Sequence, residues 1–109
     1  MIRSNGAGLA TFDTISSNIQ VTNINYSATP LANSTFFRTA AAYRLNDYAF
    51  TVNGGAVLGD SLADVPVVTT LRIGAMSNGT AAPLNGHIRR ISYYPRRLSN
   101  TVLQALTSA

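Results

Sequence analysis

Apolar and polar residues alternate in several short runs along the chain, and turn-forming residues separate these runs. The clearest run is 46–52, NDYAFTV, where the alternation puts three large side chains on one face of a strand: Tyr48, Phe50 and Val52. Asn53 and Gly54 follow, and a second apolar run comes after them. Both central residues of a type I′ turn need a positive φ, so this pattern predicts a β-hairpin that turns at Asn53-Gly54.

Four other runs predict strands, at 9–12, 18–26, 35–45 and 69–74. In 18–26, Ile19 and Val21 share one face before the alternation fails at Asn23. The run 35–45, TFFRTAAAYRL, is mostly apolar on both faces, with Arg38 as an exception in its first half, which predicts a strand covered on both sides. Its alanines are also compatible with a helix, but the flanking turn residues and the aromatic side chains favour a strand.

The C-terminal region, GHIRRISYYPRRLSNTVLQAL, predicts a strand, a corner and a helix. Ile88 and Ile91 are three residues apart, so a regular strand cannot point both to one face, and we expect a bulge near Arg89-Arg90. Ile91 and Tyr93 then share the inward face.

The corner at Pro95 is expected to end this strand, because proline lacks the N–H group of the ladder. Ser99 is a good N-cap, and three apolar residues recur behind it at helical spacing: Val102, Leu103 and Leu106. We therefore expect a short docking helix near 99–107. Leu98, just before the cap, is placed to pack against the first turn.

Composition supports a β-rich chain. The 109 residues suffice for one domain, 46% of them are hydrophobic and only 11% are charged. Lysine and glutamate, which usually fill exposed helix faces, are both absent. Cysteine is absent as well. We expect a flexible lead-in at 1–8 and a single domain at 9–109. The net charge of +4 arises from few acids as much as from many bases, and it is weak evidence for a polyanion partner.

Three stretches resemble the C-terminal half of a laminin-G-like, concanavalin A-like jelly roll: FTVNGGAV, LRIG with Gly74, and the C-terminal region from LNGHIRRISYY to LSNTVLQAL. The ending is similar to those of phage and prophage structural proteins that carry such a domain. The resemblance covers about residues 35–109 and implies an all-β, antiparallel jelly-roll-like β-sandwich with one short C-terminal helix. A full domain of this family is longer, so the sandwich is either minimal or completed by another chain.

Candidate chemistry is sparse. His87 is the single histidine, and the four acids are dispersed: Asp13, Asp47, Asp60 and Asp64. Glycoside hydrolysis needs two carboxylates facing one cleft, and the sequence supplies no evidence of that cleft. Asp60 and Asp64 share a loop and are the residues we assign to a calcium site, if the chain holds one; otherwise we expect no cofactor. For sugar binding on a sheet face, strand parity selects Arg72, Arg90 and Tyr94.

These features predict a non-catalytic, lectin-like module of a phage or prophage virion that binds glycans or a host cell surface. A purely structural assembly or decoration protein is the alternative, and a nucleic-acid-binding basic protein is the second. Nucleic acid is disfavoured because Arg89 and Arg90 should point to opposite faces of a strand. We expect synthesis in the host cytoplasm without a signal peptide or a membrane span, and location in the virion. Since both faces of 35–45 are apolar, we also expect an oligomer or another virion protein to cover part of the sheet.

Overall fold

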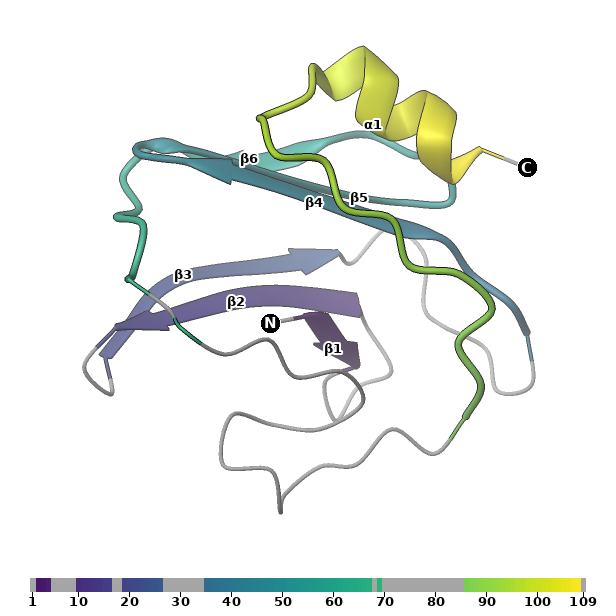
Figure 1. The fold of residues 1–109 in the computed structure, drawn as a ribbon, viewed down its shortest axis with the longest axis horizontal. Coiled ribbons are helices and arrows are strands. Elements are labelled where there is room, and N and C mark those ends of the chain that lie inside the picture. Colours follow the sequence, from purple (N-terminus) through teal and green to yellow (C-terminus); the bar gives the residue numbers. More distant parts are fainter. Residues whose placement is uncertain are drawn as a thin grey trace.

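The computed structural model describes residues 2–4, 10–16, 19–26, 35–67, 69 and 86–108. These residues form two three-stranded antiparallel sheets and one helix (Figure 1). The mostly β architecture with a short C-terminal helix is therefore confirmed. The elements, in chain order, are β1 (Ile2–Ser4), β2 (Ala10–Ser16), β3 (Ile19–Tyr26), β4 (Thr39–Arg44), β5 (Asp47–Val52), β6 (Leu58–Asp60) and α1 (Asn100–Thr107).

The first sheet has the strand order β1-β2-β3. Ile2–Ser4 lie within the expected lead-in but pair with β2. In β3 the buried side chains are Thr22, Ile24 and Tyr26, so the face that Ile19 and Val21 share is the outward one. Ile19 is 67% exposed. The buried stretch begins at a threonine, Thr22, whereas the first residue of the strand is an exposed isoleucine.

The second sheet has the order β4-β5-β6. A two-residue connection joins β4 to β5, and its second residue, Asn46, has a φ of 55°. Asparagine tolerates this left-handed conformation better than most residues. The strand predicted at 35–45 occupies only Thr39–Arg44, because Thr35 to Arg38 precede the ladder and are exposed.

The predicted turn at Asn53-Gly54 is confirmed. The φ values are 50° at Asn53 and 71° at Gly54, as a type I′ turn requires. The N–H group of Gly55 donates to the carbonyl oxygen of Val52 over 3.0 Å. β6 then returns along β5, with Phe50 opposite Leu58.

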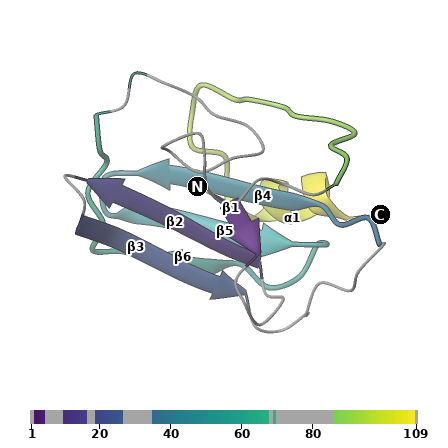
Figure 2. The same ribbon diagram turned by 90° about the horizontal axis from the view of Figure 1, so that it is seen from below.

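The two sheets face each other across a shared core, and α1 covers the far side of the second sheet (Figures 1 and 2). Phe50 is fully buried at the centre, where its ring centroid lies 5.9 Å from that of Phe12 and 6.3 Å from that of Tyr26. The parity of β5 predicted this inward face correctly. The opposite face carries Ala49, whose small side chain lets the helix approach closely.

The helix docks through fewer side chains than its sequence suggests. Ser99 is the N-cap, as predicted, and its hydroxyl accepts from the N–H group of Val102. Leu103 is buried against Ala42 and Ala49, but Val102 and Leu106 are 41% and 45% exposed. Leu98 packs against the same cluster, as expected.

Polar contacts fix the other end of the helix. The Thr107 hydroxyl accepts from the N–H group of Gly54 over 3.0 Å, and the Gln104 amide donates to the Gly55 carbonyl over 3.0 Å. The helix thereby contacts the β5–β6 turn. Sheet and helix from the same chain cover the two faces of β4, so its apolar character no longer argues for a partner. Oligomerisation stays a prediction.

Leu103→Ala is expected to lower the free energy of unfolding by about 2–3 kcal/mol, because it removes the main apolar contact between α1 and the sheet. Leu106→Ala is the matched control, since the same atoms are removed from a side chain that is 45% exposed. Urea denaturation of both variants measures the difference. Equal losses would contradict the docking geometry.

The strand expected at 86–94 is not present, and the bulge expected near Arg89-Arg90 has no ladder in which to form. Gly86 to Ser99 precede α1 as an irregular segment, and Figure 2 shows it running beyond β4, on the side away from β5. Ile91 and Tyr93, expected to face inward, are 58% and 79% exposed. The strand predicted at 69–74, including Arg72, lies outside the described residues apart from Thr69.

Candidate functional site

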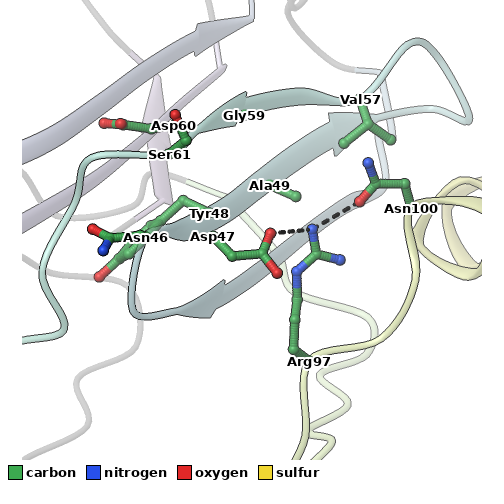
Figure 3. A pocket seen from close by; sticks show the side chains of 10 residues that line it. All are labelled: Asn46, Asp47, Tyr48, Ala49, Val57, Gly59, Asp60, Ser61, Arg97 and Asn100. Carbon is green, nitrogen blue, oxygen red and sulfur yellow. Dashed lines mark hydrogen bonds and ion pairs between the residues drawn. The ribbon is translucent and has the colours of Figure 1, made fainter.

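A polar hollow of about 270 Å³ lies between the β4–β5 turn, β6 and the start of α1 (Figure 3). Carboxylate, amide, hydroxyl and guanidinium groups line it, together with small apolar side chains. The lining residues are Asn46, Asp47, Tyr48, Ala49, Val57, Gly59, Asp60, Ser61, Arg97 and Asn100. Hydrogen-bonding groups thus converge on one site from three elements.

Asp47 is held by arginines from two directions. Its Oδ1 accepts from Nη2 of Arg97 at 2.9 Å, and its Oδ2 accepts from Nη2 of Arg44 at 2.8 Å. The Arg44 side chain is 69% exposed and lies outside the hollow, so this second pair contributes little to stability. The Arg97 side chain is only 12% exposed, and its contact orients the carboxylate inside the hollow.

Arg97 also joins the hairpin to the helix. Its Nη1 donates to the carbonyl oxygen of Leu98, and its Nη2 donates to Oδ1 of Asn100 at 2.8 Å. Figure 3 shows the guanidinium pointing at both Asp47 and Asn100. The planar fork of arginine suits this bridging role better than a lysine ammonium would.

Asp60, at the end of β6, is also a lining residue, but its carboxylate points away from Asp47 and towards the first sheet (Figure 3). Its Oδ2 accepts from the hydroxyl of Thr22, and its Oδ1 accepts from the N–H group of Leu62 at 2.9 Å. Thr22 lies in the other sheet, so this contact links the two sheets. The hydrogen bond from Thr22, followed by that from Leu62, lowers the pKa of Asp60. Both bonds favour the ionised carboxylate.

The lowered pKa of Asp60 predicts a pH-dependent stability. The folded state binds this proton less tightly than the unfolded state, so the contribution is complete above the unfolded pKa, near 4, and is lost as pH falls through the folded pKa. Asp60→Asn should therefore show a shallower loss of stability than the native chain between about pH 5 and pH 2. Thr22→Val should cost about 1 kcal/mol at neutral pH and also flatten the profile.

Urea denaturation at several pH values measures these differences. Parallel profiles for the native chain and both variants would show that the contact with Thr22 does not form in solution.

Of the site residues predicted from the sequence, the structure places one at the hollow and others away from it. Asp60 lines the hollow, whereas the Asp64 side chain is exposed and that residue's carbonyl oxygen accepts from the Tyr48 hydroxyl at 2.8 Å. In the described part of the chain, no three acidic or histidine side chains gather at one point, and the calcium site stays a prediction. Arg90 and Tyr94 are exposed and do not line the hollow; Arg72 is outside the described residues.

Sequence reasoning did not find most of the hollow. Arg97 and Asp47 are fifty residues apart, and only the docking of α1 brings them together. The weak local signals were polar residues at a turn, Asn46, and in the first turn of the helix, Asn100. His87, the one candidate imidazole, is exposed and is not among the lining residues.

Comparison with protein-family models, curated proteins and solved structures finds no match to the chain. The fold and the hollow therefore define its class by themselves: a small, mostly β protein with a polar surface site between sheet and helix. Among the described elements, no helix has the length and apolar character needed to cross a membrane.

Proposed function

We propose that this chain is a non-catalytic, lectin-like module of a phage or prophage virion and that it binds glycan in the polar hollow. The resemblance of residues 35–109 to a laminin-G-like jelly roll motivates the class and the jelly-roll topology. The observation that carries the ligand assignment is the convergence of oriented polar groups on one open site. Asp47, Arg97 and Asn100 all contribute to it (Figure 3).

Sugars present neighbouring hydroxyl groups that both donate and accept hydrogen bonds. Carboxylates accept from two such groups, and amides do both, so the mixture in this hollow matches a sugar edge. Asp47 is already fixed by two arginine donors, which reduces the ordering cost of binding. Asn46 and Ser61 also line the hollow. A volume near 270 Å³ accommodates a single sugar unit, and binding is therefore expected to be weak per site.

The same geometry argues against glycoside hydrolysis, because the carboxylates of Asp47 and Asp60 do not face each other across the hollow (Figure 3). A general acid needs a raised pKa, and the pKa of Asp60 is lowered. Both oxygens of Asp47 are already engaged by arginines. The hollow supports binding better than it supports catalysis.

A glycan array followed by calorimetry on the best ligand tests this function. Asn46→Gly should weaken binding about fivefold or more, because glycine keeps the positive φ of the turn and removes only the amide. Asn53→Gly is the matched control at the other positive-φ asparagine, outside the hollow. An array without signal, or equal losses in both variants, would overturn glycan binding in the hollow.

A structural assembly role is the second candidate. It is supported by the many large apolar side chains that the fold leaves exposed, including Phe37 at 44%, Leu45 at 59% and Leu62 at 89%. Light scattering coupled to size exclusion at micromolar concentration tests it. Dimers or trimers without glycan binding would favour assembly, and a heat-stable monomer of 11.5 kDa would argue against it.

A further inference from the structure

The irregular segment before the helix is a second polar and aromatic surface, separate from the hollow. Every residue from Gly86 to Arg96 is exposed. Tyr93 is 79% exposed and Tyr94 is 43% exposed. Large aromatic side chains at these exposures remain available to a ligand, whereas a strand packed on the core would have buried one of them.

Among the residues that the structure describes, none is an acidic partner of the arginines in this segment. The ion pairs recorded among the described residues both use Asp47, with Arg44 and Arg97. The guanidinium of Arg89 instead lies 3.5 Å from the ring centroid of Phe36, and Nε of Arg90 donates to the Ser92 hydroxyl at 3.2 Å. Neither contact neutralises the charge, so the segment carries uncompensated positive charge.

The contact between Arg89 and Phe36 also ties the segment to the residues that precede β4. A cation over an aromatic face is worth about 0.5–1 kcal/mol at an exposed site. This restricts Arg89 without covering Tyr93 or Tyr94, which keep the exposures given above.

We propose that the segment 86–96 binds single-stranded nucleic acid, with Tyr93 and Tyr94 stacking on bases and Arg89, Arg90 and Arg96 contacting phosphates. Positive charge that follows the backbone, combined with aromatic stacking, is the general chemistry of such sites. The objection from the sequence, that Arg89 and Arg90 alternate across a strand, does not apply, because this segment forms no strand. Arg90 and Arg96 are at most about 20 Å apart along an extended chain, enough for a few nucleotides.

Two rival ligands fit less well. Duplex DNA hides the faces of its bases, so Tyr93 and Tyr94 would contribute nothing to binding. An acidic polysaccharide offers carboxylate or sulfate groups to the arginines and can pack sugar C–H groups on the tyrosines, but a flat base stacks its whole face on such a ring, at about 1–3 kcal/mol per base. The combination of free tyrosine faces with unpaired arginines therefore favours unpaired bases.

Fluorescence anisotropy with a labelled oligothymidylate measures the binding. With three phosphate contacts, the slope of log affinity against log salt concentration should be about −2. Replacement of Arg89, Arg90 and Arg96 by glutamine should bring this slope towards zero. Tyr93→Ala should weaken binding roughly tenfold at constant salt, because one stacked base is lost.

Matched variants distinguish binding at the segment 86–96 from non-specific attraction to the positive charge of the protein. Arg44→Gln removes one positive charge outside the segment and should change affinity less than twofold, whereas Arg90→Gln should weaken binding more strongly. Leu62→Ala, at a side chain 89% exposed elsewhere, is the control for Tyr93→Ala.

Three results would overturn the proposal: no binding at low salt, equal effects of Arg44→Gln and Arg90→Gln, or equal affinity for single-stranded and duplex DNA. Stronger binding of a sulfated polysaccharide that is insensitive to Tyr93→Ala would also overturn it and would assign the segment to an acidic glycan. None of these outcomes depends on the hollow, so glycan binding there is tested separately.

Discussion

Phe50→Ala is expected to lower the free energy of unfolding by about 3–5 kcal/mol, the largest effect of any single substitution considered. Phe50 is fully buried between the two sheets and contacts the rings of Phe12 and Tyr26. Truncation removes the buried apolar surface of the ring and its contacts with two other rings. It also leaves a cavity between the two sheets. A small domain has only about 5–15 kcal/mol of stability, so this loss should leave a barely stable protein.

Thermal and urea denaturation of Phe50→Ala measure this loss, with Phe37→Ala as the matched control. Phe37 is 44% exposed and should cost less than about 1 kcal/mol when truncated. Similar stabilities for the two variants would mean that the sheets do not share this core.

Gly55→Ala is expected to cost about 2–3 kcal/mol, because the added methyl group meets a buried side chain. A Cβ at this position would lie 2.0 Å from the Tyr26 hydroxyl oxygen and 3.1 Å from the Val52 carbonyl oxygen. Tyr26 is 2% exposed and cannot move without disturbing the contact with Phe50. Either the tyrosine or the β5–β6 turn must shift.

Gly86→Ala is the control for this substitution, since nothing lies within 4 Å of a Cβ at Gly86. It should change stability by less than about 0.5 kcal/mol. Denaturation followed by far-UV and near-UV circular dichroism measures the stability of both glycine variants. A neutral Gly55→Ala would contradict the position of Tyr26 under the turn.

The sequence predicted those parts of the fold that local chemistry decides. The turn at Asn53-Gly54 follows from the φ preferences of asparagine and glycine, and the start of the helix follows from the capping hydroxyl of Ser99. The inward face of β5 follows from period-two alternation of large side chains, which Phe50 exemplifies. These features depend on a few neighbouring residues.

The alternation of polar and apolar residues is a poor guide where a polar side chain is buried or an apolar side chain is exposed. In β3 the buried face includes Thr22, because its hydroxyl is satisfied by Asp60 of the other sheet, and the isoleucine at position 19 is exposed instead. Similarly, the pattern Ile91-x-Tyr93 suggested a strand with an inward face, but a strand also needs a neighbour to pair with. Among the described strands, none pairs with this segment.

The residues of the hollow could not be predicted from the sequence for a different reason. Its main ion pair joins Asp47 to Arg97 through the docking of α1, and no spacing rule relates residues that far apart. The predicted calcium site included Asp60, a residue of the hollow, but the donors that fix its carboxylate, Thr22 and Leu62, come from tertiary structure and loop geometry.

The most direct test of glycan recognition in the hollow is a two-dimensional NMR titration of the isotopically labelled chain with the best ligand from the glycan array. Binding in the hollow predicts that amide shifts concentrate at Asn46, Asp47, Ser61 and Asn100 and remain small at Tyr93 and Tyr94. Shifts centred on the two tyrosines would place the glycan on the irregular segment instead. That result, or an unchanged spectrum, would contradict the proposed site.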